Sequence, residues 1–341
     1  MVEIITMGLD IAKSVFQVHG VDSSGSVVVR RQLRRAELLK YFSSLPPCLV
    51  GMEACGSAHY WARQIGALGH RVRLLPPAHV KPYVKRGRKN DAADAAAICE
   101  AVSRPHMQFV PVKSETSQAV LLLHRARDLL VRQRTMLICA FRSHLAEFGL
   151  IAGQGKGNFA KLVAGLAQDE TLPVLARQTL QLIAAQIDDG NEKIEALEQE
   201  IALQHRRDEA SRRLASIPGI GPIIASALVA SVPDASAFKS GRQFAAWLGL
   251  VPRQNSTGGK ERLGGITKAG DRYLRRLLVI GATGLIRYKR KNVPGGLAWV
   301  TGLLAKKPVR LVTVALANKM ARIAWAILCR GEIYREAAAT S

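Results

Sequence analysis

The sequence predicts an α/β domain built on a mixed β-sheet, followed by an all-α region and a basic, mainly helical C-terminal region. In the first hundred residues, short apolar runs bounded by turn residues alternate with helical patterns, which is typical of an α/β fold. From about residue 109 to residue 210 the pattern is helical throughout. From residue 251 to residue 341 there are 18 Lys or Arg against 4 Asp or Glu, which marks this end of the chain as the part that contacts a polyanion.

The composition is that of a multidomain protein with a polyanionic partner. With 341 residues, of which 48% are hydrophobic, the chain is long enough for two or three domains with their own cores. Its formal net charge is +23 and its isoelectric point is near 10.4. Nucleic acid fits this charge better than a membrane surface, because the basic residues are interleaved with core patterns instead of being gathered on one amphipathic helix.

Five cysteines are scattered along the chain without Cys-x-x-Cys spacing, which argues against a common zinc module. Because they stand in apolar segments, we expect reduced, buried thiols. We expect no secretory signal, and no apolar run of membrane-spanning length. The predicted location is therefore the cytoplasm, in a cell where the cytoplasm meets DNA, with no membrane partner.

The first domain is predicted to span residues 1–108. Its expected strands are residues 4–9, 15–21, 27–33, 48–52 and 72–75. Its expected helices are residues 36–43, residues 59–66 and one that opens at Asp91. A meander of three antiparallel strands leading into β-α-β units gives a mixed sheet, like that of the ribonuclease H class of folds.

Four acidic residues of this domain stand where a strand ends or a helix begins. Asp10 and Glu53 close two expected strands, while Asp91 and Asp94 open a helix three residues apart and so share a face. Strand ends in α/β sheets gather catalytic groups, and converging carboxylates can hold divalent metal against a phosphate backbone. Each acid alone is better explained as a structural residue, such as a turn residue or a helix cap, than as a catalytic one. The combination favours a metal site.

The second region, residues 109–210, is predicted to be a helical linker. A long helix over residues 121–148 carries five arginines. From residue 180 to residue 210 Ile and Leu recur at near-heptad spacing, and ten of the chain's 26 acidic residues lie between residues 169 and 209. Such an acidic helix pairs with another helix rather than with DNA. The pattern leaves an intramolecular hairpin and a dimer seam equally open.

The third region, residues 211–341, begins with the motif Ile-Pro-Gly-Ile-Gly at residues 217–221. A helical run follows it, which is the pattern of a helix-hairpin-helix. In such a motif Gly219 and Gly221 would let the backbone approach a phosphate without reading sequence. An ordinary turn between two helices is the alternative.

A polar, cationic, Gly-rich loop follows at residues 252–260 and contains two hydroxyl groups, those of Ser256 and Thr257. Either hydroxyl could act as a nucleophile if a metal or a base activated it. On chemistry alone both are more simply turn formers, so the residues by themselves do not single out Ser256.

Five motifs then occur in one order along the chain. They are Glu-Ala-Cys-Gly-Ser-Ala-His at residues 53–59, Lys-Asn-Asp-Ala-Ala-Asp-Ala at residues 89–95, Ser-Ile-Pro-Gly-Ile-Gly at residues 216–221, Phe-Ala-Ala-Trp-Leu-Gly-Leu-Val-Pro-Arg at residues 244–253 and Gly-Gly-Ile-Thr-Lys-Ala-Gly at residues 264–270. Together they resemble the DEDD-type insertion-sequence transposases of the IS110 group, which are similar to the pilin-gene invertases. The resemblance spans nearly the whole chain.

The resemblance implies a RuvC-like catalytic domain over residues 1–108, a helical coiled-coil linker over residues 109–210 and a C-terminal transposase domain over residues 211–341. It implies that the acidic quartet binds Mg²⁺ or Mn²⁺ and is catalytic. It also implies that Ser256 is the catalytic serine, with Thr257 as the competing hydroxyl.

Proteins of this family are recombinases guided by a structured noncoding RNA that pairs with donor and target DNA. They act as homodimers that assemble into homotetramers, in which the serine of one subunit is thought to meet the acidic site of another. Attack by the serine would leave a phosphoserine-linked strand that can be rejoined to a new partner. The residues expected to neutralise the nucleic-acid backbone are Arg253, Lys260, Arg262, Lys268, Arg275 and Arg276.

Two other functions fit parts of the same sequence. A hydrolytic endonuclease of the junction-resolvase type would use the quartet with water as nucleophile and would not need Ser256. A non-catalytic nucleic-acid scaffold would keep the basic C-terminal region and tolerate loss of the acids.

Overall fold

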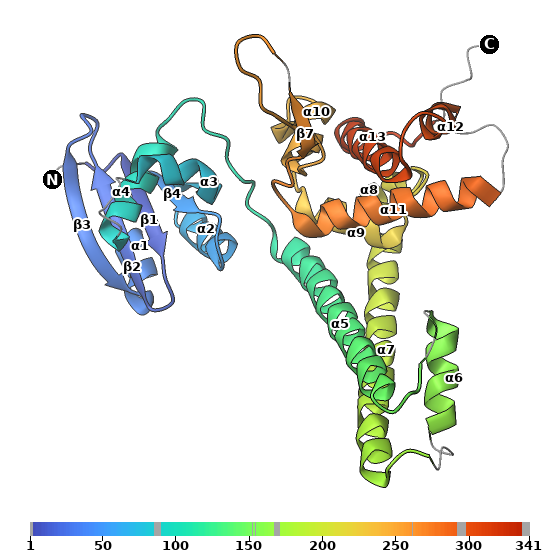
Figure 1. Cartoon of the computed structure of the whole chain (residues 1–341). Helices are drawn as coiled ribbons and strands as arrows, with labels where there is room; N and C mark the ends of the chain where they lie inside the picture. Colours follow the sequence, from blue (N-terminus) through green and yellow to red (C-terminus); the bar gives the residue numbers. More distant parts are fainter. Residues whose placement is uncertain are drawn as a thin grey trace. The chain divides into compact units, whose positions relative to one another are not determined.

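The computed structural model describes residues 3–84, 90–151, 153, 155–166, 171–260, 262–291 and 298–335. The chain forms two compact units, one ending at Glu115 and one beginning at Thr116 (Figure 1). The first unit extends beyond the expected limit at residue 108, because the backbone N–H of Val110 donates to the carbonyl of Leu74 at the edge of the sheet. The expected linker and C-terminal region lie together in the second unit.

The first unit contains the predicted mixed sheet, with strand order β3-β2-β1-β4-β5. The strands are β1 (Thr6–Ile11), β2 (Val15–Val21), β3 (Val27–Arg34), β4 (Leu49–Glu53) and β5 (Arg71–Leu75). The first three pair antiparallel, and β4 and β5 run parallel to β1. The sheet is therefore the one that a meander followed by β-α-β units predicts.

Helices cover both faces of this sheet. They are α1 (Leu38–Ser43), α2 (Ala58–Ala67), α3 (Pro77–Val80) and α4 (Asp91–Val102), with 3₁₀ turns η1 (Arg35–Glu37) and η2 (Lys81–Tyr83). Apolar side chains of β1 and β4, such as Leu9 and Met52, lie in one core cluster with side chains of α1 and α2, such as Phe42 and Trp61. Alternation along a strand turns the intervening residues to the opposite face, where α4 packs.

Two strand glycines bring α4 unusually close to the sheet. A Cβ atom on Gly8 of β1 would lie 2.1 Å from the carbonyl oxygen of Ala95, and one on Gly51 of β4 would lie 2.7 Å from Cβ of Val102. Only glycine leaves this space, so these two positions set the depth at which α4 docks. The start of α4 is thereby held over the strand ends.

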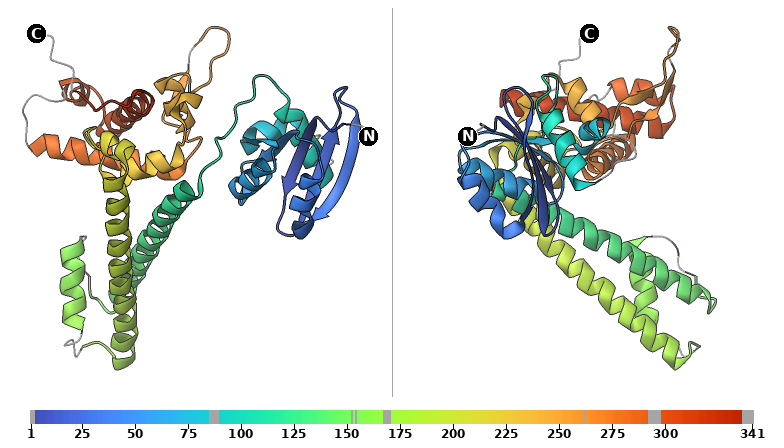
Figure 2. Two further views of the ribbon diagram at one scale, coloured as in Figure 1. Left: turned by 180° about the vertical axis from the view of Figure 1, so that it is seen from behind. Right: turned by 90° about the vertical axis from the view of Figure 1, so that its left-hand side faces the viewer.

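The second unit begins with three helices, α5 (Glu115–Ala146), α6 (Lys156–Leu166) and α7 (Val174–Arg207). In Figures 1 and 2, α5 and α7 run in opposite directions and cross at an angle. Phe141 of α5 and Ile187 of α7 share a core cluster, and Nε of Arg127 donates to Oε1 of Glu198 at 2.7 Å. The acidic, near-heptad face of α7 therefore pairs with the arginine-rich α5 within one chain.

The C-terminal part of this unit packs around one hydrophobic core. Its elements are α8 (Glu209–Leu214), α9 (Pro222–Ser231), the 3₁₀ turn η3 (Ala235–Ala237), α10 (Gly241–Trp247), β6 (Pro252–Gln254), β7 (Leu263–Ile266), α11 (Arg272–Lys291), α12 (Ala298–Leu304) and α13 (Val309–Arg330). The sequence predicted only a loop where β6 and β7 form a short antiparallel hairpin. Its glycines hide the alternation by which strands are recognised.

One helix of the second unit bears on the expectation about membranes. Helix α13 is long and apolar enough to cross a bilayer by length and composition, although Lys319 and Arg322 interrupt its apolar sequence. Its residues Val312, Leu316 and Met320 are buried in the core of the C-terminal part. This burial is that of a core helix in a globular domain.

The expectation of buried thiols is correct for only part of the set. Cys48 and Cys99 are buried in the first unit, whereas Cys55, Cys139 and Cys329 are exposed, and all five are free. The three exposed cysteines stand in a turn and on the outer faces of helices. Apolar neighbours in the sequence do not bury a residue at such positions.

Candidate active site

Two carboxylates stand side by side at the carboxyl ends of parallel strands. The parallel register pairs Leu9 of β1 with Met52 of β4, so the next positions along are Asp10 and Glu53. Both side chains are half-buried. The register thus brings together two acids that are 43 positions apart in the sequence, as the strand pattern predicted.

Burial and negative neighbours raise the pKa of both acids. Burial raises the pKa of Asp10, and the negative charges of Asp94 and Asp91 raise it further. Burial likewise raises the pKa of Glu53, with added contributions from Asp10 and Asp94. Negative neighbours thus destabilise the charged form of each acid, and no cation contributes to either pKa shift. A bound positive charge would therefore stabilise the ionised carboxylates.

The other two acids of the quartet come from the first turn of α4. The Asn90 side chain caps this helix by accepting a hydrogen bond from the backbone N–H of Ala93 at 2.8 Å. Asp91 is exposed and Asp94 is half-buried. The motif residue Lys89 lies outside the described residues.

The quartet fits a divalent metal by its chemistry. An all-carboxylate donor set offers the hard oxygen ligands that Mg²⁺ and Mn²⁺ prefer. Within the part of the chain that the structure describes, no three His, Cys, Asp or Glu side chains approach closely enough to form a metal-binding group. The acids therefore lie within electrostatic reach of one another but short of the convergence that coordination requires.

One residue beside this site was not anticipated from the sequence. Cys55, two residues after Glu53, lies in the exposed turn, and burial together with the charges of Glu53 and Asp10 raises the pKa of its thiol. Its Sγ donates to the carbonyl of Gly56 at 3.5 Å. Its position within the motif at residues 53–59 was the signal available for finding it.

The candidate serine belongs to the second unit. Ser256 and Thr257 are exposed between β6 and β7, at the tip of a hairpin turned by Gly258 and Gly259 with φ of +56° and +77°. The Lys260 N–H donates to the Thr257 carbonyl at 3.1 Å. The hairpin therefore presents both hydroxyls to solvent, and geometry leaves the choice between them open.

Four of the predicted backbone-neutralising residues gather on this hairpin and its return. Arg253, Lys260, Arg262 and Lys268 are all exposed there. Lys268 adopts φ of +56°, an uncommon conformation for a residue with a side chain. The hairpin and its return therefore carry exposed cations, and two hydroxyl groups lie at the hairpin tip.

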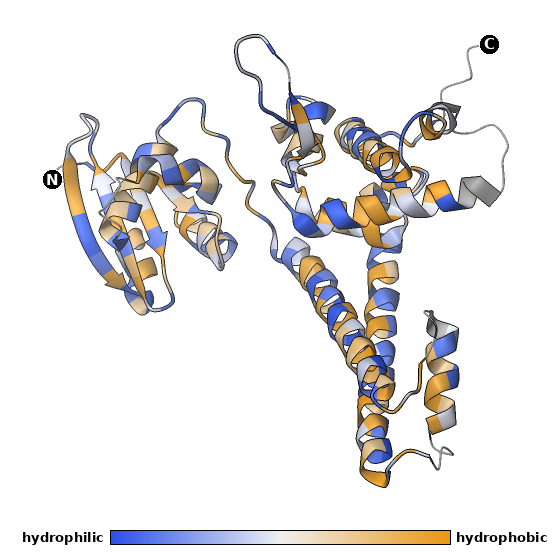
Figure 3. Cartoon of the chain, in the orientation of Figure 1, coloured by the Kyte–Doolittle hydropathy of each residue, from blue (hydrophilic) through white to orange (hydrophobic). Residues whose placement is uncertain are grey.

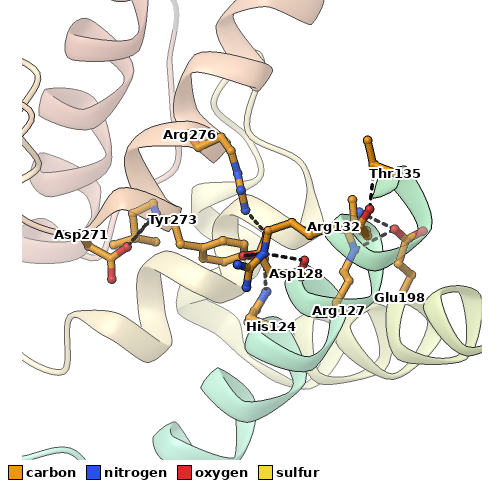
Figure 4. Close-up of polar contacts among 11 residues, drawn as sticks. His124, Arg127, Asp128, Arg132, Thr135, Glu198, Asp271, Tyr273 and Arg276 are labelled. Carbon is orange, nitrogen blue, oxygen red and sulfur yellow. Dashed lines mark hydrogen bonds and ion pairs between the residues drawn. The ribbon is translucent and has the colours of Figure 1, made fainter. Parts of the chain in front are cut away.

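The other two predicted cations are engaged inside the unit. Arg275 donates from Nη1 to the carbonyls of Leu248 and Ala269 at 3.0 and 2.7 Å. Arg276 pairs with Asp128 of α5 and lies over the ring of Tyr273 (Figure 4). These contacts show that both arginines bind groups within the unit, which their charge and their place in the sequence could not predict.

The glycines of the 217–221 turn also differ from each other. Gly219 has φ of +86°, and a Cβ atom there would lie 3.2 Å from the carbonyl oxygen of Gly281 in α11. Gly221 is exposed at the N-cap of α9, with open space where a side chain would be. Packing against α11 therefore accounts for Gly219, while Gly221 leaves the start of α9 accessible.

Sequence reasoning missed a polar junction between α5 and the C-terminal helices. His124 is fully buried, with Nδ1 3.1 Å from the Tyr273 hydroxyl and Nε2 3.2 Å from the Ser226 hydroxyl (Figure 4). Burial lowers the pKa of His124 to about 4. A histidine among the arginines of a long helix was the available signal.

A mixed sheet with two carboxylates at its strand ends and two on the first turn of α4, followed by a helical hairpin and a basic helical part, fits the DEDD class of nucleic-acid-processing enzymes. The profile of DEDD transposases of the IS110 type matches residues 7–149, and that described as the transposase IS116/IS110/IS902 family matches residues 211–294. The DEDD match implies use of a divalent metal ion.

Curated relatives match over almost the whole chain. The transposase for insertion sequence element IS1328 of Yersinia enterocolitica is 41% identical over 98% of this chain and 99% of its own length. The transposase for insertion sequence element IS1111A of Coxiella burnetii is 40% identical over 98% of this chain and 92% of its own length. A Pseudomonas aeruginosa protein named "Probable family 20 transposase" is 52% identical over 96% and 98% respectively. The chain belongs to the IS110/IS116 family of insertion-sequence transposases.

Proposed function

We propose that this transposase cleaves and exchanges DNA strands of its insertion sequence with Ser256 as the nucleophile. The observation that carries the proposal is the position of Asp10 and Glu53 at adjacent strand ends, where burial and the charges of α4 raise the pKa of both. Such a site gains from a cation and from the polyanionic substrate that the cation binds.

Asp10, Glu53, Asp91 and Asp94 would hold Mg²⁺ or Mn²⁺. When bound, the metal supplies Lewis-acid stabilisation of negative charge on the scissile phosphate. Without it the quartet repels a phosphate. The closeness of α4 to the sheet, set by Gly8 and Gly51, keeps the carboxylates of α4 within reach of those on β1 and β4.

In the chemical step Oγ of Ser256 attacks phosphorus. The Oγ–P bond forms as the P–O bond to the leaving strand breaks, and the serine proton passes to a base at the acidic site, which returns it to the leaving oxygen. One phosphodiester replaces another, so the strand can be rejoined when a hydroxyl of a new strand attacks the phosphoserine. The exposed cations of the hairpin, including Arg253 and Lys260, would neutralise the strand as it enters.

Target choice is assigned to base pairing with a structured guide RNA that contacts both donor and target DNA. A net charge of +23 suits a chain that holds RNA and two DNA duplexes together. Gly221 at the open start of α9 and Lys268 on the hairpin return would contact backbone phosphates.

A second copy of the chain is the expected partner, first in a homodimer and then in a homotetramer. The outer face of α5 carries a repeat of three and four residues, formed by Ala119, Leu122, Ala126, Leu129, Gln133, Met136 and Ala140. Leu122, Leu129 and Met136 are 66%, 48% and 70% exposed (Figure 3 shows the apolar positions along α5). A stripe with this spacing is that of a coiled-coil seam. Light scattering should show a dimer for the wild type and a monomer for Leu129→Glu.

The deciding experiment uses cells that carry the protein with its native flanking noncoding DNA. Recombinant junctions and denaturation-resistant protein–DNA adducts are measured for wild type, Ser256→Ala, Thr257→Ala and Asp10→Ala. We expect both signals from wild type and Thr257→Ala, and neither from the other two. Recombination by Ser256→Ala would transfer the role to Thr257 or water, and metal-dependent cleavage without an adduct would identify a hydrolytic nuclease.

A further inference from the structure

A large groove in the second unit lies directly beside the hairpin that carries Ser256. It has a volume of about 1060 Å³ and is walled by α10, by the β6–β7 hairpin, by α12 and by α13. None of its residues belongs to the acidic quartet or to the cations already assigned to phosphate. Its size exceeds that of a pocket for one drug-sized ligand and suits a short run of nucleotides.

Three exposed cations line this groove, Arg242 of α10 and Lys319 and Arg322 of α13. No Asp or Glu stands among the described residues that line it, and no described residue forms an ion pair with any of the three. Close packing holds two of them together, because a Cβ atom on Gly241 would lie 3.1 Å from the carbonyl oxygen of Arg322. The groove is therefore charged to receive an anion.

An aromatic ring stands in the same groove. Trp299 of α12 is 41% exposed, and the ammonium group of Lys319 lies 4.7 Å from the centroid of its ring. The cation–π contact fixes the orientation of the indole and places a cation beside whatever packs on it. A flat exposed ring next to cations is the arrangement that binds unpaired bases by stacking while the cations track the backbone.

The hairpin wall is shaped for close approach and is firmly held. Gly264 and Gly265 of β7 line the groove, and no atom lies within 4 Å of where a Cβ on Gly265 would be. Asn318 of α13 donates from Nδ2 to the carbonyl of Leu250 at 3.1 Å, just before β6. A strand could thus lie against the backbone of β7 without displacing side chains.

From these contacts we propose that this groove binds an unpaired nucleic-acid strand, with a base stacked on Trp299 and phosphates on Arg242 and Arg322. A duplex does not suit it, because its bases are stacked on each other and present no free face to the indole. The strand could come from DNA opened at the cleavage site or from a single-stranded part of the guide RNA. That identity rests on the proposed function, whereas strand binding itself does not.

The test is fluorescence anisotropy of the full chain with labelled oligothymidylate, oligouridylate and a mixed-sequence duplex. We expect Trp299→Ala to weaken single-strand binding by roughly 5- to 150-fold, as loss of one stacked base does, and to leave duplex binding unchanged. Trp299→Phe, which keeps a stacking face, should retain most of the affinity. Preference for the deoxy strand assigns the groove to DNA, and preference for the ribo strand assigns it to RNA.

A charge-matched pair of variants provides the control. Arg322→Ala and Arg330→Ala remove the same charge from the same helix, but only Arg322 lines the groove. We expect Arg322→Ala to weaken single-strand binding more and to lower the salt dependence by about 0.7 in the logarithmic slope. Equal effects of Arg322→Ala and Arg330→Ala would overturn the proposal. Wild-type single-strand affinity in Trp299→Ala would also overturn it. So would equal losses of affinity in Trp299→Phe and Trp299→Ala, provided that both variants are folded.

The assay contains no chemistry, so it separates this inference from the proposed function. If Trp299→Ala binds single strands normally and still forms serine adducts, the groove proposal is overturned and the proposed role of Ser256 stands. If single-strand binding depends on the groove but Ser256→Ala still recombines, the groove proposal stands and the proposed role of Ser256 is overturned.

Discussion

The side chain of Arg275 donates a hydrogen bond of 2.7 Å to the carbonyl of Ala269, where the chain returns from the β6–β7 hairpin to α11. The same nitrogen reaches the carbonyl of Leu248 on the outgoing side, at 3.0 Å. Gly270 completes this crossing, since a Cβ atom there would lie 1.8 Å from the Trp247 carbonyl oxygen. One guanidinium thus ties together both ends of the segment that carries Ser256.

We therefore expect Arg275→Met to reduce serine adduct formation by making the hairpin mobile. Hydrogen bonds from a charged donor contribute about 1.5–3 kcal/mol each, so hydrogen exchange of the hairpin amides should rise markedly. Arg272→Met, which removes the same charge from an exposed position at the start of α11, should leave both measurements near wild type. Unchanged exchange in Arg275→Met would show that the hairpin is held by other contacts.

Gly8→Ala should disrupt the acidic site by displacing α4, which packs on the same face of the sheet to which Gly8 and Asp10 point. Its methyl group would meet the backbone of α4 at 2.1 Å, so α4 must shift and carry Asp91 and Asp94 with it. Overpacking of this kind costs about 1–3 kcal/mol or more, and strand cleavage should fall with it. Thermal unfolding of Gly66→Ala provides the control, because that helical glycine has open space and alanine there should be neutral or stabilising.

Asp10→Asn should stabilise the metal-free protein while it abolishes cleavage. The pKa of Asp10 is raised in the folded state, so the folded state binds protons more tightly and stability falls as pH rises from about 4 through the raised pKa. At pH 7 in EDTA, removal of this charge should raise Tm by a few degrees. Addition of Mg²⁺ should raise the Tm of wild type and have little effect on the variant. A Tm response to Mg²⁺ that survives in Asp10→Asn would place the metal elsewhere.

His124 predicts a pH dependence of the opposite sign. Its folded pKa of about 4 lies below the unfolded value near 6.5, so the stabilisation is complete above pH 6.5 and is lost as pH falls toward 4. The loss amounts to roughly 3 kcal/mol for a fully buried histidine. Denaturant unfolding of wild type should show this slope, and His124→Gln should flatten it. An equally steep slope in the variant would assign the dependence to other groups.

The sequence indicated the acidic pair at the strand ends because strand boundaries are local. Asp10 and Glu53 each follow an apolar run, and the parallel order of β1 and β4 brings their ends to one edge. The pairing of α7 could not be chosen in this way. Its near-heptad face fits any apolar partner helix. The structure shows that the partner is α5 of the same chain, with Arg127 opposite Glu198.

The sequence by itself determined the mixed sheet, the helical linker, the basic C-terminal part and the family, all of which follow from local periodicity, composition and ordered motifs. Only the tertiary structure decided which like-charged residues serve which purpose. Arg275 and Arg276 match Arg253 in charge, yet they close the hairpin and pair with Asp128. Charge is a property of the residue, whereas its partner is a property of the fold, because the groups that satisfy it come from elements far apart along the chain.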